Sequence, residues 1–162
     1  MSNPKRIHWS WSNIEVASKY IKSRLDFDGF KPDYIVGLTR GGLIPAVLLS
    51  HMMGVKLETL NVSLRDSEEG PESNLWLPDV ATVENKKILI VDDINDSGAT
   101  FEWIKKDWDS SELPFNGCKW DNIKFATLVH NEASVTKTDY AFISIDKSKE
   151  DTWIVFPWEK ND

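Results

Sequence analysis

The sequence is poor in cysteine, in basic charge and in long apolar runs, and each shortage excludes a class of protein. One cysteine, Cys118, cannot build a disulfide framework or a cysteine-rich zinc site, so a reducing, cytosolic setting is expected. Nineteen basic against 26 acidic residues give a net charge of −7, which argues against a nucleic-acid-binding protein. The longest apolar run, residues 42–49, includes a proline and is too short to cross a bilayer.

Apolar and aromatic residues, in contrast, are plentiful enough for a packed core. The 162 residues are 41% apolar and include eight Trp and seven Phe, a composition that excludes intrinsic disorder. A chain of this length suits one domain over residues 1–162. No apolar segment follows the first basic residues, so no secretory signal is expected. We therefore expect a soluble protein of a single domain.

Strand patterns and helix patterns alternate along the chain, which predicts a parallel α/β sheet. The expected helices cover residues 13–27, 43–53 and 101–107. Residues 12–15 have the S-x-x-E form of a capping box for the first helix, and Gly29 and Gly54 end the first two. The β-branched run 87–91 is typical of a central strand that is covered on both faces. The other expected strands are at 33–38, 56–64, 123–130, 140–145 and 153–156.

Residues 64–80 are expected to form a flexible loop. The stretch 65–74 is polar, lacks periodicity and contains both glycine and proline. A loop this long in a compact domain is more often a lid than an idle connection. Its tip, residues 75–77, carries the apolar sequence Leu-Trp-Leu, which an idle loop would not need. We favour a mobile lid, and the alternative is a β-hairpin arm that packs on a partner subunit.

Two adjacent carboxylates, Asp92 and Asp93, follow the central strand, at the edge where open α/β sheets bind ligands. The turn at 96–100 then opens a helix, and its small residues let backbone N–H groups close on an anion, assisted by hydroxyls. One loop thus offers an acidic end for hydroxyls or a metal ion and a cradle for phosphate, which matches a ribose 5-phosphate. The alternative, a helix cap with a solvated turn, fits an isolated Asp-Asp pair better than this arrangement.

Three segments resemble motifs of the type I phosphoribosyltransferases, in the same order and over roughly residues 30–158. Residues 90–100, IVDDINDSGAT, resemble the family signature for 5-phosphoribosyl pyrophosphate (PRPP), with Ser97 and Ala99 replacing its commonest Thr and Gly. Residues 36–45, VGLTRGGLIP, resemble its pyrophosphate loop. The segment DTWI, followed by Pro157-Trp158, is similar to the base-binding segment of bacterial xanthine-guanine phosphoribosyltransferases.

The resemblance implies the type I phosphoribosyltransferase fold, a mostly parallel sheet flanked by helices, with its core at about 30–145. A small hood would come from about 1–12 and 146–162. The implied reaction is Mg²⁺-dependent transfer of phosphoribose from PRPP to a 6-oxopurine such as guanine, xanthine or hypoxanthine, giving a nucleoside monophosphate and pyrophosphate in purine salvage. A cytoplasmic homodimer or homotetramer is also implied, and Trp9 and Trp11, taken as exposed, would mark a subunit interface.

The resemblance also implies a role for each matched residue. Asp96 would face the purine N7 and act as the acid/base. Asp92 and Asp93 would bind the ribose hydroxyls, directly or through Mg²⁺. The pyrophosphate loop often contains a non-proline cis peptide in this family. The other implied contacts are those of Ser97, Gly98, Ala99 and Thr100 with the 5-phosphate, of Thr39, Arg40 and Gly41 with pyrophosphate, and of Trp153 and Ile154 with the base. For Trp153, stacking is favoured over the alternative of core packing.

One position departs from the family pattern. The xanthine-guanine enzymes place a lysine after the fourth core strand, where it donates to the purine 6-oxygen. Aligning residues 126–131 on that segment puts Asn131 at the lysine position, beside His130. An amide can donate or accept, so the preference among purine bases stays open. His130 as a metal ligand is a weaker reading, because the sequence has no second His or Cys at ligand spacing.

Two other functions remain in view. A non-catalytic regulator could keep the fold as a nucleotide sensor that binds RNA or a protein, but Asp96 and the net charge of −7 favour an enzyme. A phosphoribosyltransferase could also act on another base, such as a pyrimidine, and Asn131 leaves that reading open.

Overall fold

A five-stranded parallel sheet forms the centre of the computed structural model, which describes residues 3–62, 76–110 and 117–159. Its strand order is β3-β2-β4-β5-β6, and every neighbouring pair is parallel. The strands are β2 (Tyr34–Leu38), β3 (Lys56–Leu60), β4 (Ile88–Asn95), β5 (Ile123–Asn131) and β6 (Tyr140–Ile145). The predicted α/β fold class with a parallel central sheet is therefore confirmed, and the β-branched run does form the middle strand.

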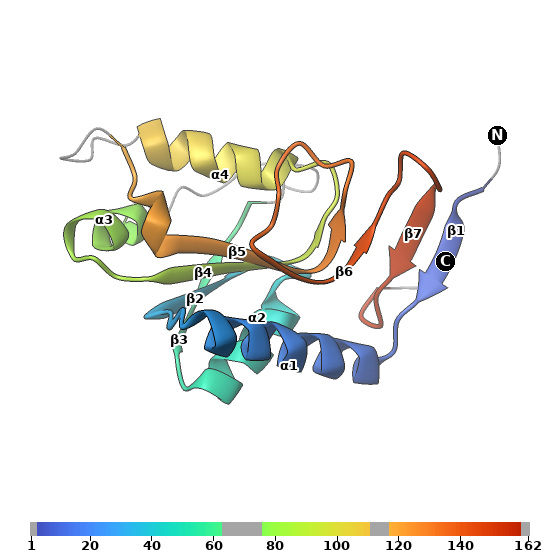
Figure 1. Ribbon diagram of the computed structural model, residues 1–162, viewed down its shortest axis with the longest axis horizontal. Coiled ribbons are helices and arrows are strands. Elements are labelled where there is room, and N and C mark those ends of the chain that lie inside the picture. Colours follow the sequence, from blue (N-terminus) through green and yellow to red (C-terminus); the bar gives the residue numbers. More distant parts are fainter. Residues whose placement is uncertain (1–2, 63–75, 111–116, 160–162) are drawn as a thin grey trace.

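Helices cover both faces of this sheet and give the protein two apolar cores (Figure 1). Helices α1 (Trp11–Asp28) and α2 (Leu43–Met53) pack on one face, where Ile21 and Leu49 are fully buried. Helices α3 (Trp76–Val83) and α4 (Ala99–Ser110) pack on the other, where Phe101 and Trp108 are buried. A 3₁₀ turn, Trp120–Asn122, precedes β5. Strand β4 is covered on both sides because it lies between the two cores.

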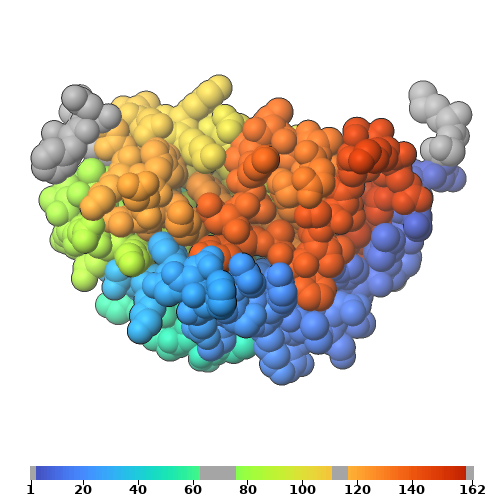
Figure 2. Space-filling model, in the orientation of Figure 1, coloured from blue at the N-terminus to red at the C-terminus, as the bar shows by residue number. Residues whose placement is uncertain are grey.

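The two ends of the chain lie together in a separate two-stranded sheet. Strand β1 (Lys5–His8) runs parallel to β7 (Thr152–Val155), with Arg6 opposite Trp153. Figure 1 shows β1 and β7 side by side, beyond β6, and Figure 2 shows the blue and red segments in contact there. This is the small hood of the expected fold, and it carries the segment that resembles a base-binding motif.

Several predicted boundaries are wrong. The first helix is capped by Ser10, not Ser12, because Ser10 exchanges hydrogen bonds with Asn13. Residues 76–83 form helix α3 rather than the end of a loop, since Leu77 and Ala81 are buried against the sheet. The remainder of the predicted loop, 64–75, lies outside the described residues. The choice between a mobile lid and a hairpin arm therefore stays a prediction. Strand β3 ends at Leu60, short of the predicted residue 64.

The subunit-interface reading of Trp9 also needs correction. Trp9 is buried, and its ring packs edge-on against Phe142 and Phe156, which come from β6 and from the end of β7. It therefore joins the hood to the main core. Trp11 is 57% exposed. None of the helices in the described part of the chain combines the length and apolar character needed to span a membrane.

Candidate active site

The site lies at the point where the strand order of the sheet reverses, between β2 and β4. From β2 the chain passes outward to β3, and from β4 it passes to β5 on the opposite side. Ligands of open α/β sheets bind at such a switch point, beyond the carboxyl ends of the strands. The loop 39–42 leaves the end of β2, and the acid pair Asp92 and Asp93 lies near the end of β4. The fold thus brings two of the three predicted motifs to one point.

The predicted pyrophosphate loop packs directly on the acid pair. A Cβ on Gly41 would overlap Asp93 Oδ2, and a Cβ on Gly42 would overlap the carbonyl oxygen of Val91. The Thr39–Arg40 peptide is cis, as the resemblance led us to expect. Thr39 is hydrogen-bonded to Leu60 at the end of β3 and to Asn61 just after it, and the Arg40 side chain is exposed. A side chain at either glycine would enter the space between the loop and the strand.

Gly42→Ala is expected to destabilise the protein by about 1–3 kcal/mol, the usual range for overpacking. Gly42 has φ −69°, which suits any residue, so the substitution tests space alone. Its added methyl group would meet backbone atoms of Val91 and Leu38, which cannot rotate away. Gly41→Ala is the matched comparison, because its added methyl group would meet the Asp93 carboxylate, a side-chain group that can rotate away. We expect thermal denaturation to show a lower Tm for Gly42→Ala than for Gly41→Ala, and equal values would contradict this packing.

The acid pair is half-buried, and each carboxylate accepts a hydrogen bond from the backbone. Asp92 Oδ1 accepts from the N–H of Asp93 at 2.9 Å, and Asp93 Oδ1 accepts from the N–H of Ile94 at 2.8 Å. Burial raises the pKa of Asp92 well above its usual value, and the neighbouring Asp93 charge raises this pKa further. Burial also raises the pKa of Asp93. Such a pair favours a cation beside it, or a proton on one carboxyl.

Mg²⁺ fits this donor set. It prefers carboxylate oxygens and is often held by one or two protein carboxylates together with substrate oxygens. Among the described residues, no group of three or more His, Cys, Asp or Glu side chains is placed to hold a metal ion. Asp92 and Asp93 would supply carboxylate oxygens to such an ion.

The predicted phosphate turn opens helix α4. Ser97 and Ala99 are exposed, and α4 begins at Ala99, so the first N–H groups of the helix lie at this turn. Gly98 has φ +90°, a conformation that favours glycine, and its missing Cβ would lie 2.6 Å from Ser134 Oγ. The N–H of Val135 donates to the carbonyl of Ser97 at 3.1 Å. The turn is thus in contact with the loop that follows β5.

A buried polar network that sequence reasoning missed supports this turn. Asn95 Nδ2 lies 3.1 Å from His130 Nδ1 and also donates to the carbonyl of Thr136, while Ser134 Oγ donates to Asn95 Oδ1 at 3.2 Å. The Thr136 hydroxyl donates to a carboxylate on α4. His130 is therefore a hydrogen-bonded interior residue. The signal in the sequence was weak, because these residues lie on separate segments.

Asp96 is the meeting point of three segments. Its Oδ2 lies 3.1 Å from Lys147 Nζ, and its carbonyl accepts from Asn131 Nδ2 at 3.0 Å. Asn131 is buried, and its Oδ1 accepts from the N–H groups of Ala133 at 3.2 Å and Lys147 at 3.0 Å. The Asp96 side chain is 37% exposed, which leaves it open to a ligand. Sequence reasoning missed Lys147 altogether.

Trp153 stands apart from the apolar core. It is 46% exposed, whereas its neighbours Thr152 and Ile154 are buried. Lys147 Nζ lies 5.5 Å from the centroid of its ring, within range of a cation–π contact. The hood therefore offers an accessible aromatic face beside the ammonium that pairs with Asp96.

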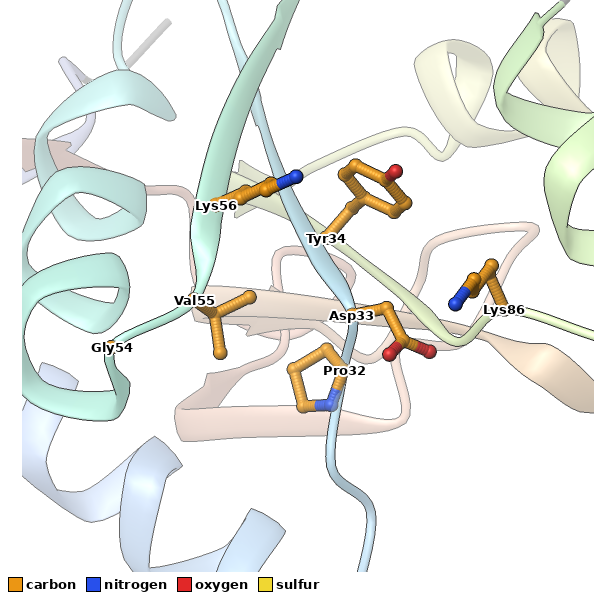
Figure 3. A pocket seen from close by; sticks show the side chains of 7 residues that line it. All are labelled: Pro32, Asp33, Tyr34, Gly54, Val55, Lys56 and Lys86. Carbon is orange, nitrogen blue, oxygen red and sulfur yellow. The ribbon is translucent and has the colours of Figure 1, made fainter.

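A cavity of about 340 Å³ lies elsewhere, at the amino ends of β2 and β3 (Figure 3). Tyr34 and Lys56 are the first residues of these strands, and Asp33, Lys56 and Lys86 supply its charged groups. Because all the predicted site residues lie near the carboxyl ends of strands or in the hood, this cavity is separate from the site.

Comparisons with known proteins cover nearly the whole chain. A family model described as phosphoribosyl transferase domain matches residues 10–160. The chain is 31% identical to a xanthine-guanine phosphoribosyltransferase of Cereibacter sphaeroides, over 98% of this chain and 90% of that protein. It is 35% identical to the Gluconobacter oxydans protein of that name, over 96% and 88%. The crystal structure of a purine phosphoribosyltransferase from Pyrococcus horikoshii matches with a TM-score of 0.72 and 31% identity, covering 98% of this chain and 96% of that one.

Proposed function

The chain belongs to the phosphoribosyltransferase family, and from this premise we propose that it transfers the phosphoribosyl group of PRPP to a 6-oxopurine. The products would be a nucleoside monophosphate and pyrophosphate, as expected of a purine-salvage enzyme. One observation carries the proposal. An acid pair, a glycine loop packed on it, an anion turn at a helix N-terminus and an accessible tryptophan all lie around one edge of the molecule.

Different residues would bind different parts of the two substrates. Backbone N–H groups and hydroxyls at 97–100 would bind the 5-phosphate, because a helix N-terminus attracts anions. Asp92 and Asp93 would bind the ribose hydroxyls. Thr39, Arg40 and Gly41 would bind the pyrophosphate, and the base would stack on Trp153 beside the backbone of Ile154.

In the reaction, the bond from C1 of ribose to pyrophosphate breaks as a bond from C1 to a purine nitrogen forms. The sugar acquires cationic character, and nearby carboxylates stabilise it. The Asp96 carboxylate would take up the proton that the purine loses, a contribution of about 10²–10⁴-fold in general base catalysis. When bound to Asp92 and Asp93, Mg²⁺ would neutralise charge on the leaving pyrophosphate.

A non-catalytic regulator is disfavoured because the chain belongs to an enzyme family and has Asp96 open to a ligand. Another base is disfavoured because the named relatives are purine enzymes.

The test is release of pyrophosphate from PRPP with a panel of adenine, guanine, hypoxanthine, xanthine, uracil and orotate. We expect turnover with at least one 6-oxopurine in Mg²⁺, loss of that turnover in EDTA, and its return with excess Mg²⁺. Turnover with a pyrimidine alone would contradict the proposed substrate. Full activity in chelator would contradict the role given to the metal.

A further inference from the structure

Lys147 lies between two residues of the proposed site, and the roles given so far do not use it. Its Nζ is 3.1 Å from Asp96 Oδ2 and 5.5 Å from the ring centroid of Trp153. Only 19% of its side chain is exposed, so the ammonium is largely withdrawn from water. An ammonium has three donors and no acceptor, so it can hold the Asp96 carboxylate and still donate to a ligand. Lys147 is therefore placed to donate a hydrogen bond to a ligand that stacks on Trp153.

The backbone of Lys147 is held in place by Asn131. The buried Asn131 amide accepts from the Lys147 N–H at 3.0 Å and donates to the Asp96 carbonyl at 3.0 Å. These bonds tie β5 to both of the residues that meet in the ion pair. Asn131 is only 5% exposed, so its side chain is turned into the protein rather than toward a ligand. Its position suits a positioning residue for Lys147.

We propose that Lys147 determines the base specificity of this enzyme. Its ammonium donates to the exocyclic 6-oxygen of a purine that stacks on Trp153, and Asn131 fixes the backbone from which it reaches. A 6-amino group is a donor and cannot accept from an ammonium, so the same contact rejects 6-aminopurines. The inference rests on the proposed function, because it names the residue that selects the substrate of that reaction.

Lys147→Met tests the contact, since methionine keeps much of the length and apolar stem without the charge. A hydrogen bond to a charged group contributes about 1.5–3 kcal/mol, which corresponds to a roughly 10- to 100-fold loss of kcat/KM for guanine. We expect this loss mainly in KM for the base, because the contact is made in the ground state as well. Adenine should gain or stay unchanged, and KM for PRPP should not move.

Lys149→Met is the matched control. Lys149 lies two residues away, is 83% exposed and pairs with Asp146 at 3.4 Å. The same substitution there should leave the base preference unchanged. Asn131→Ala should lower the guanine-to-adenine ratio in the same direction as Lys147→Met, whereas a merely structural defect would lower activity with every base alike.

The analogue 2-aminopurine, which is guanine without the 6-oxygen and the N1 proton, lacks the acceptor concerned. Guanine analogues that keep the 6-oxygen are compared with 2-aminopurine as competitive inhibitors. In the wild type, the analogues with the oxygen should have the lower inhibition constants. In Lys147→Met, this difference in inhibition constants should vanish. An unchanged difference, in a wild type that does use guanine, would overturn the role of Lys147 and leave the proposed function standing. A wild type that turns over no 6-oxopurine would overturn both.

Discussion

Asp96→Asn is expected to lower kcat by about 10²–10⁴-fold, the range that a positioned general base supplies. Asparagine keeps the size of the side chain but cannot accept a proton. The turn should keep its shape, because Asn131 holds Asp96 through its backbone carbonyl and not only through the carboxylate. We therefore expect the affinity for PRPP to stay within a few-fold of wild type, so that the loss lies in the chemical step.

Steady-state turnover together with titration of PRPP separates these two effects. Asp121→Asn is a suitable control, since this exposed residue precedes β5 and its substitution changes the net charge by the same amount. A near-normal kcat in Asp96→Asn would contradict the role of Asp96 as the general base. A large loss of PRPP affinity would instead assign Asp96 to substrate binding.

Asp92→Asn should separate activity from stability. Loss of one carboxylate contact to ribose or to Mg²⁺ is expected to reduce kcat/KM by roughly 10- to 100-fold, given about 1.5–3 kcal/mol for hydrogen bonds to charged groups. The metal-free protein, however, should become more stable at neutral pH, with a higher Tm. Burial and the adjacent Asp93 raise the pKa of Asp92, which means that the folded state holds this carboxylate at a cost.

The pH dependence follows from the direction of that pKa. The folded state binds the proton more tightly than the unfolded chain, so the contribution of Asp92 to stability is fully present below the ordinary aspartate pKa. It is lost as pH rises through the folded pKa. The Tm difference between Asp92→Asn and wild type should therefore grow from about pH 4 toward pH 8.

This experiment is done in EDTA, because a bound cation would offset the charge of the pair. Asp121→Asn again provides the control, and its Tm difference from wild type should not grow with pH. A Tm of Asp92→Asn below that of wild type across this range would contradict the conclusion that burial and Asp93 disfavour the charged form of Asp92.

The parts of the fold that local sequence determines were predicted well. Helix α2 and strand β6 have the predicted bounds, because their apolar runs are flanked by glycine or polar residues. Helix α3 was missed, since it is only eight residues long, contains a proline and follows a long polar stretch that we interpreted as a loop. Trp9 was misjudged for a similar reason, because its partners Phe142 and Phe156 are distant in sequence.

The candidate site divides in the same way. The segments 39–42 and 92–100 could be located because each is a continuous motif whose role depends on a short turn. Lys147 could not be found, because it lies in the polar run Asp-Lys-Ser-Lys-Glu, which is typical of a solvated loop. Its contact with Asp96 joins residues 51 positions apart. Only the packing of the hood against the end of β4 reveals that contact.

The pairing of β1 with β7 has a consequence for the order of assembly. Lys5 lies opposite Thr152, so the two-stranded sheet closes almost the entire chain into one loop. Contacts between such distant residues carry the largest closure entropy and form late in folding. During synthesis, β1 is made well before β7 and cannot pair until β7 is available. The half of the site that would hold the sugar and its phosphates lies on the five-stranded sheet and does not need this pairing, so we expect discrimination between bases to be gained only after β7 joins β1.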